Sequence, residues 1–270
     1  RLAKYVALVF PKFLLNTPEF STTRAELAQK SVDAILDFGE KGFPGILVET
    51  IAIFINNLAA PANTKVFSLT HRLHLTQPQA YIFDPELPYW IIYRNQLFDS
   101  VCRKLDFDVF EVFRDRQLTN KLLSSSGELR VLKSRNLSDD GKEILDIPGY
   151  DSYISYAAAK PLSVFQYLDA PNVYLTPNMT YKPRMMKKPP HCVVNGSLAI
   201  LIPKGGIVPT EKQLAYFSSE EYRAFYQIAR NFQTRSLNVD ACSVFFYGLL
   251  RDEAKPAPEK FDTSVQLSFL

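Results

Sequence analysis

The sequence predicts the closing part of an α/β sheet followed by a separate α+β domain, and three observations lead to this expectation. A continuous apolar run at Tyr5–Phe10 is typical of a strand covered on both faces, as in parallel α/β sheets. Two more strand candidates and one helix follow within residues 23–56. Beyond residue 107 the pattern changes to short strands and turns with one long helix, expected at 218–232.

In chain order, the first part is predicted as strand, helix, strand, loop and strand. A Ser/Thr cluster at 21–23 can cap a helix, and 23–31 is helical in composition. The segments 32–39 and 49–56 are apolar enough for buried strands, and glycines loosen the loop between them. Three strands and one helix cannot cover both faces of a sheet, so we expect the other half of this layer to lie upstream.

A polar, proline-spaced stretch at 61–88 indicates a linker, and 88–105 is the candidate for an amphipathic helix at the junction. The second part extends to residue 250. Its strand candidates are 107–113, 128–137, 172–183, 192–204 and 242–250. From residue 251 a tail rich in Pro, Lys and Glu is expected to be poorly ordered.

Positive charge is concentrated in the second part, although the net charge of +3 is too small to indicate a polyanion partner by itself. Residues 170–210 contain no acid and hold five basic residues: Lys182, Arg184, Lys187, Lys188 and Lys204. A second cluster sets six basic residues against Asp115 and Glu128: Arg114, Arg116, Lys121, Arg130, Lys133 and Arg135. Such clusters are typical of a phosphate-facing surface or of solvated loops, and charge alone favours the loops.

Cysteine usage and hydropathy limit the setting. Cys102, Cys192 and Cys242 are odd in number and widely spaced, which favours a reducing cytoplasm over a disulfide framework. No apolar run approaches the roughly 20 residues needed to cross a bilayer.

Metal and acid–base sites are weakly indicated. His71 and His74 form an HxxH pair without an acidic or cysteine partner nearby, so no metal is expected. Asp33, Asp37 and Glu49 are interpreted as caps or solvent-facing groups at strand ends.

Two segments carry a family resemblance: GFPGILVETIAIFI at 42–55, and ELRVLKSRNL at 128–137 followed by a basic strand pair and LAYFSSEEYRAFYQIARNFQTRSLNV at 214–239. In order and spacing they resemble the gamma-class, TaqI-type N6-adenine DNA methyltransferases of restriction–modification systems. The resemblance implies that 1–60 is the C-terminal part of a Rossmann-like catalytic domain and 61–106 a linker and connecting helix. It further implies a target-recognition domain at 107–250 and a tail at 251–270.

Members of this family flip one adenine out of duplex DNA and methylate its exocyclic nitrogen with S-adenosylmethionine. The family's Asn/Asp/Ser-Pro-Pro-aromatic tetrapeptide is absent, because DPELPYW at 84–90 and KKPPH at 187–191 have the wrong spacing or neighbours. The glycine-containing cofactor loop is also absent, and GEKGFPG at 39–45 lies too late to replace it. We therefore expect no catalytic residue in this chain, no activity from it alone, and a cofactor bound mainly by upstream sequence or a partner methylase chain.

The resemblance also assigns binding residues. Phe43 matches the aromatic residue that stacks on the flipped adenine, and a core role before a buried strand is the alternative. Lys133, Ser134, Arg135 and Asn136 match an element expected to touch bases or phosphates of DNA. Asn136 could equally cap a turn.

The expected DNA-binding set is completed by Arg114, Arg116, Lys182, Arg184, Lys187, Lys188 and Arg235. Arg184, Lys187 and Lys188 are interpreted as phosphate clamps or groove probes on a loop between strands. Arg235 follows the long helix, where a role in ending the helix is favoured over DNA contact.

Three other interpretations stay open. A specificity subunit without a catalytic role would bind DNA for a separate methylase or nuclease and would need no upstream α/β half. An RNA methyltransferase fragment would prefer single-stranded or structured RNA. An interaction domain unrelated to nucleic acid would make the basic clusters incidental. The expected setting is a bacterial or archaeal cytoplasm with double-stranded DNA as partner, no membrane, and a restriction nuclease as a candidate further partner.

Overall fold

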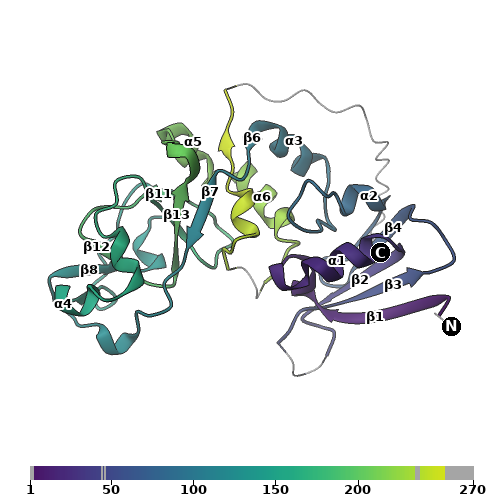
Figure 1. The fold of residues 1–270 in the computed structure, drawn as a ribbon, viewed down its shortest axis with the longest axis horizontal. Coiled ribbons are helices and arrows are strands. Elements are labelled where there is room, and N and C mark those ends of the chain that lie inside the picture. Colours follow the sequence, from purple (N-terminus) through teal and green to yellow (C-terminus); the bar gives the residue numbers. More distant parts are fainter. Residues whose placement is uncertain (1–2, 44, 46, 235–237, 253–270) are drawn as a thin grey trace. The chain divides into compact units, whose positions relative to one another are not determined.

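The computed structural model describes residues 3–43, 45, 47–234 and 238–252, which belong to two compact units. The first unit contains the described residues up to 103 together with 227–234, and the second contains 104–226 together with 238–252. Short helices and several small sheets are mixed along the chain (Figure 1). A mixed α and β fold is thereby confirmed, whereas a Rossmann-like sheet stays a prediction.

The first unit is built on a five-stranded sheet of order β1-β3-β2-β4-β5. Its strands are β1 Tyr5–Pro11, β2 Ser31–Gly39, β3 Thr50–Asn56, β4 Asn63–Ser68 and β5 Leu73–Pro78. β3 is antiparallel to β1 and β2, β5 is antiparallel to β4, and β2 and β4 are parallel. β1, β2 and β4 therefore run in one direction and end at the same edge of the sheet.

The predicted strands at the start of the chain are confirmed, and the helix expected at 23–31 is α1, Ser21–Ala28. Residues 61–88, however, are wrongly predicted as a linker, because they contain β4 and β5. Polar residues of this stretch face inward: Thr64 is fully buried and donates its hydroxyl to the Val32 carbonyl at 2.7 Å.

The burial predicted for β1 is also wrong. Tyr5 is 66% exposed and Val9 54% exposed, and Phe54, on the neighbouring β3, is 40% exposed. Among the described residues β1 pairs with β3 alone, so one edge of β1 has no strand beside it in this part of the chain. The opposite face of the sheet is closed, since Ile35 and Ile53 have no exposed surface.

The helix expected at 88–105 forms only as α3, Gln96–Lys104. The segment before it is buried without regular structure, and side-chain hydrogen bonds take the place of a helical ladder. Asn231 donates its amide to the Trp90 carbonyl at 2.7 Å and accepts from the Ile92 backbone at 2.9 Å. The other helical elements of this unit are η1 Lys12–Leu15, η2 Pro18–Phe20 and α2 Gln79–Ile82.

The second unit contains three sheets, of orders β11-β10-β13-β7, β12-β8-β9 and β14-β6. The strands are β6 Leu105–Asp106, β7 Phe110–Phe113, β8 Leu129–Leu132, β9 Ser152–Ile154, β10 Tyr174–Pro177, β11 Met186–Lys187, β12 Cys192–Val194, β13 Leu198–Pro203 and β14 Leu249–Leu250. Only β12 and β8 are paired in parallel among these described strands. The helical elements are η3 Asn120–Leu122, η4 Ser134–Asn136, α4 Tyr156–Ala159, η5 Ser163–Tyr167, η6 Lys204–Gly206, α5 Glu211–Tyr216, α6 Glu220–Ala229 and η7 Ser243–Phe246.

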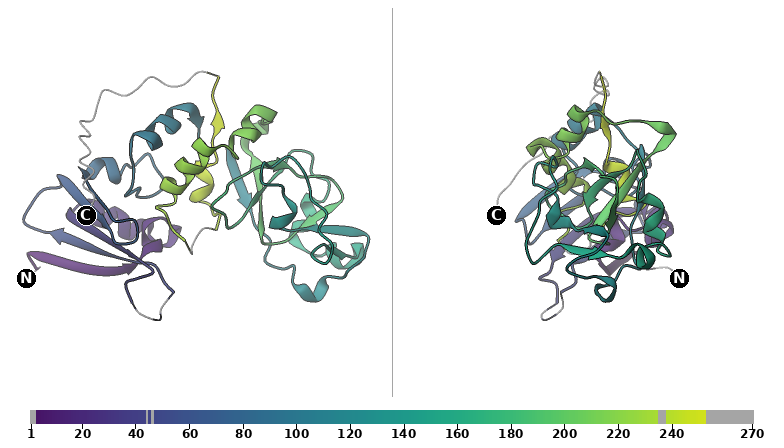
Figure 2. Two further views of the ribbon diagram at one scale, coloured as in Figure 1. Left: turned by 180° about the vertical axis from the view of Figure 1, so that it is seen from behind. Right: turned by 90° about the vertical axis from the view of Figure 1, so that its left-hand side faces the viewer.

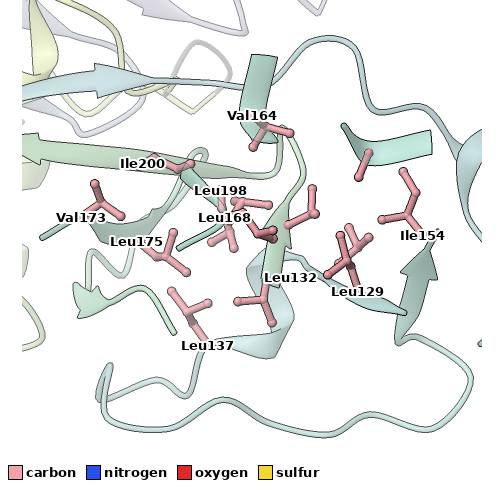
Figure 3. Close-up of a cluster of buried hydrophobic side chains, with 14 residues drawn as sticks. Leu129, Leu132, Leu137, Ile154, Val164, Leu168, Val173, Leu175, Leu198 and Ile200 are labelled. Atoms are coloured by element: carbon pink, nitrogen blue, oxygen red, sulfur yellow. The ribbon is translucent and has the colours of Figure 1, made fainter. Parts of the chain in front are cut away.

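The two larger sheets of this unit share one apolar core. Leu132 on β8, Leu175 on β10 and Leu198 on β13 have no exposed surface and lie within this cluster (Figure 3). Figure 2 shows the same unit from two further directions. This core holds the loops that leave β8 and β10, where most of the predicted binding residues are found.

The long helix predicted at 218–232 is confirmed as α6, whereas the strand predicted at 242–250 is wrong. Asp240 accepts from the backbone N–H groups of Cys242 and Ser243 at 3.1 and 2.8 Å, which starts the turn η7 instead of a strand. Only the last residues of the stretch pair, as β14. The tail expected from residue 251 lies almost entirely outside the described residues.

In the described part of the chain no helix has the length and apolar character required to cross a membrane. Cys102, Cys192 and Cys242 all lie within the described residues and form no disulfide, and burial raises the pKa of the Cys102 thiol to about 12.

Replacing Leu198 by Ala should lower the free energy of unfolding by about 2–5 kcal/mol, because a fully buried side chain leaves a cavity in the shared core. Chemical denaturation monitored by circular dichroism measures the change. Leu122→Ala, at a side chain that is 37% exposed, is the matched control and should cost less than about 1 kcal/mol. Equal effects of the two variants would contradict the assignment of the core.

Candidate nucleic-acid interface

The predicted DNA-contacting element lies in a tight turn that follows β8. Asn136 has no exposed surface and closes this turn: its Oδ1 accepts from the Lys133 backbone at 3.0 Å. Its amide donates to the Leu145 carbonyl at 3.0 Å and to Asp151 Oδ1 at 2.7 Å. The turn-capping alternative for Asn136 is therefore what the structure shows, and its amide has no free donor for a base.

The ring of Tyr150 lies beneath two cations of the same turn. The Lys133 ammonium is 3.9 Å and the Arg135 guanidinium 4.8 Å from the ring centroid. Lys133 also donates to the Tyr150 carbonyl and, at 3.0 Å, to the Ser152 hydroxyl. Burial lowers the pKa of Lys133. Arg135 is exposed, so of the two cations it is the one presented to solvent.

Further contacts hold the turn from the interior of the unit. The Ser134 backbone N–H donates to the Ser197 hydroxyl at 2.9 Å, and the Ser134 carbonyl accepts from Arg184 at 3.2 Å. A turn held by so many side chains presents Arg135 in a fixed orientation, which is what a preorganised recognition site requires.

The basic segment before and along β11 divides into two exposed and two buried residues. Lys182 and Lys187 are exposed. Arg184 is 8% and Lys188 4% exposed, and burial lowers the pKa of both. Lys188 donates to the carbonyl groups of Leu168 and Pro189 at 2.7 and 2.9 Å, so its ammonium is held inside the unit.

Arg114 and Arg116 lie directly after β7. Asp115 between them is buried and accepts from the backbone N–H groups of Gln117 and Leu118 at 3.3 and 2.8 Å. Its carboxylate is thereby committed to the backbone. Burial lowers the pKa of the Arg114 guanidinium, and the neighbouring Arg116 charge lowers it further. Two like charges side by side favour an anionic partner at this position.

In the first unit, Phe43 is 45% exposed on the loop between β2 and β3. Leu47 and Val48 of the same loop are 65% and 40% exposed. The predicted alternative, a core role for Phe43, does not fit this exposure. The loop leaves the edge of the sheet where β1, β2 and β4 end.

A buried ion cluster lies at the same edge. The Lys12 ammonium, 1% exposed, is 2.7 Å from Asp37 Oδ2 and 3.7 Å from Glu49 Oε1. Tyr93 donates its hydroxyl to Asp37 Oδ2 at 2.5 Å, and burial followed by the Asp37 charge raises the Tyr93 pKa well above its usual value. Asp37 and Glu49 therefore do not face solvent, because both are buried beside Lys12. The capping role is confirmed for Asp37, whose Oδ1 accepts from the Gly39 backbone N–H at 2.8 Å.

The HxxH histidines do not converge. The His74 ring stacks on Phe67 with centroids 4.4 Å apart, whereas His71 packs against Phe232 at 4.9 Å. Within the described residues no group of three or more His, Cys, Asp or Glu side chains could hold a metal ion.

Two features were missed from the sequence, and one prediction cannot be placed. The role of Tyr150 was indicated only weakly, by the presence of an aromatic residue in a polar loop after Pro148 and Gly149. The contacts of Lys12 and Tyr93 could not be predicted, because their partners are distant in sequence. Arg235 lies outside the described residues, while Gln233 nearby is buried and hydrogen-bonded to Asn16 at 2.7 and 3.1 Å.

The described residues do not fit an S-adenosylmethionine site. The first strand, β1, runs into Pro11 and the turn η1, without the glycine-rich strand-to-helix connection that such a cofactor requires. The glycine-containing loop at 39–45 instead connects the antiparallel strands β2 and β3. No reaction step through this cofactor is assigned to this chain.

No family model and no curated protein matches the sequence. Among solved structures, the chain is similar to the type IIG restriction endonuclease BpuSI, with 9% sequence identity and a TM-score of 0.32. The similarity covers 91% of this chain and 39% of that enzyme, so the chain spans about two fifths of its length. A likeness this distant adds nothing to the geometry above.

Replacing Lys12 by Met should lower the free energy of unfolding by about 3–5 kcal/mol, because it leaves two carboxylates buried without a counter-charge. Urea denaturation at pH 7 measures the loss. Lys30→Met, at an exposed lysine, is the control and should change stability by less than about 0.5 kcal/mol. Adding Asp37→Asn to Lys12→Met should restore part of the loss, and an additive further loss would contradict the ion cluster.

Proposed function

We propose that this chain recognises duplex DNA sequence-specifically as part of an S-adenosylmethionine-dependent N6-adenine DNA methyltransferase of a restriction–modification system. The observation that carries the proposal is the turn Lys133–Asn136. Its backbone is fixed by internal hydrogen bonds while Arg135 stays exposed over the Tyr150 ring. A rigidly held guanidinium beside an aromatic ring suits contact with guanine edges or phosphates.

Exposed cations of the second unit support a polyanionic partner. Arg116, Lys182 and Lys187 are exposed in the same unit, and Arg114 is half-buried beside Arg116. Only Lys182 of these four lies within 4 Å of a described carboxylate, Asp139 at 3.7 Å. Unpaired surface cations can exchange their counterions for DNA phosphates, which favours binding at low salt.

Exposed apolar residues of the first unit support its association with a catalytic half. The exposed ring of Phe43 is available to stack on a base, and stacking of this kind contributes about 1–3 kcal/mol. The apolar face formed by Tyr5, Val9 and Phe54 is exposed, and β1 offers one edge for a further strand. In the proposal, the catalytic half adds strands at this edge and supplies both the tetrapeptide and the cofactor site.

Selection from randomised duplex DNA tests the proposal. We expect the chain to enrich a short word containing adenine, with affinity falling steeply between 50 and 200 mM salt, as it does in general for proteins that make several phosphate contacts. Preference for structured RNA in a direct competition would favour an RNA methyltransferase. A pure specificity subunit would be favoured if adding a catalytic half left the enriched word unchanged and produced no methyl transfer. The absence of binding at low salt would refute DNA recognition.

Phe43→Ala should weaken stabilisation of a flipped base about tenfold in the chain combined with its catalytic half, since one base–aromatic stack is lost. The measurement is the fluorescence of 2-aminopurine placed at the target adenine of the enriched word. Phe43→Trp keeps an aromatic face and is the matched control. Equal signals from the Ala and Trp variants would remove Phe43 from the proposed site.

A further inference from the structure

A pocket of about 460 Å³ lies beside the turn Lys133–Asn136 in the second unit. Its apolar walls come from Leu137, Leu145 and Ile147. Its polar lining consists of Arg135, Arg184 and Asp139, with Ser138 beside Asp139.

Arg184 is a buried cation that forms no ion pair with a described residue, although the Asp139 charge acts on it from a greater distance. Its guanidinium donates only to carbonyl groups, those of Lys182 at 3.1 Å and of Ser134 and Leu137 at 3.2 Å. Its Nε–H is buried and has no hydrogen-bond acceptor. In the part of the chain that the structure describes, no carboxylate lies within 4 Å of it.

Two other cations with little exposed surface contact carboxylates. Lys12 lies between two carboxylates, and the partly buried Arg130 contacts Asp146 at 2.6 Å and Asp151 at 3.0 Å. Lys188 has carbonyl partners alone, as Arg184 has, but it does not line this pocket. A buried charge without a counter-charge is costly, so an anion entering the pocket would relieve a cost that the fold leaves in place.

A second guanidinium lines the same pocket. Arg135 is exposed, and its position over the Tyr150 ring restricts where its guanidinium can lie. The acid of the pocket, Asp139, lies 3.7 Å from Lys182, which balances its charge. The pocket therefore keeps two guanidinium groups for one ligand, and guanidinium binds phosphate oxygens through paired N–H groups.

We propose that this pocket binds one phosphodiester group of the target duplex, held by Arg135 and Arg184, with the adjoining sugar against the apolar wall. The proposal rests on the proposed function, because duplex DNA is the source of the phosphate. A phosphate bound in this pocket fixes the register of the DNA on the turn. The register in turn determines which base pairs the neighbouring exposed residues can reach.

Duplex binding across a salt series tests the pocket with Arg135→Gln and Arg184→Gln. Each variant should bind about tenfold more weakly and reduce the slope of log affinity against log salt by about 1, as expected for one lost phosphate contact. Lys30→Gln removes the same charge from an exposed site in the first unit and should leave the slope unchanged. Because Arg184 also holds the turn, thermal unfolding of its variant is measured in parallel, and the exposed Arg135 provides the variant that leaves the fold intact.

Inorganic phosphate, titrated at constant ionic strength with chloride, separates the pocket from the proposed function. The Arg184 Nε–H resonance should shift with phosphate in the unmodified chain and shift less in Arg135→Gln. A phosphate response without duplex binding would support the pocket and refute DNA recognition. Sequence-specific duplex binding with an unchanged salt slope in Arg135→Gln and no response to phosphate would overturn the pocket and leave the proposed function standing.

Discussion

The Lys12 ammonium, buried between the carboxylates of Asp37 and Glu49, joins three points of the chain that are far apart in sequence. Lys12 follows β1, Asp37 lies near the end of β2, and Glu49 precedes β3. Because removing Lys12 would leave two carboxylates inside the fold without a counter-charge, the ends of these three elements are held together by its ammonium. The loop that carries Phe43 starts and finishes at two of these anchored positions, so the same interaction that stabilises the sheet edge also places the exposed aromatic ring.

The second unit also contains charged side chains with little exposed surface, and they are stabilised in two ways. Arg130 and Asp151 pair with each other, and Asp151 also accepts from Asn136, so one carboxylate connects β8 to the turn that follows it. Arg184 holds the other side of that turn by donating to carbonyl groups, which orders the backbone but gives its guanidinium no ion pair with a described residue. Rigidity and residual positive charge therefore coincide at one place, a combination that favours an anionic ligand over a neutral one.

How far the fold followed from the sequence depended on the kind of pattern. Short segments rich in apolar residues identified β1, β2 and β3, because their length favours strands over helices. In contrast β4, with Asn63, Thr64 and Lys65 in its first half, resembled a linker, and its inward-facing Thr64 is satisfied by a carbonyl 32 residues away. The run at 242–250 looked like a strand because hydrophobicity alone does not distinguish a buried turn from a strand, and Asp240 decides for the turn.

For the candidate site, the sequence indicated which segments are basic but not which basic groups face outward. Arg184 and Lys188 each donate to a neighbouring carbonyl and to carbonyl groups 20 to 50 positions away, whereas Lys182 and Lys187 beside them are exposed. No local pattern contains that information, since the acceptors come from other strands and turns. A charge cluster therefore overstates the number of phosphate contacts that a surface can make. The salt dependence of binding should follow the smaller number of cations that can exchange a counterion for a phosphate. Arg184 is counted among them, although it is buried, because its guanidinium lines the pocket.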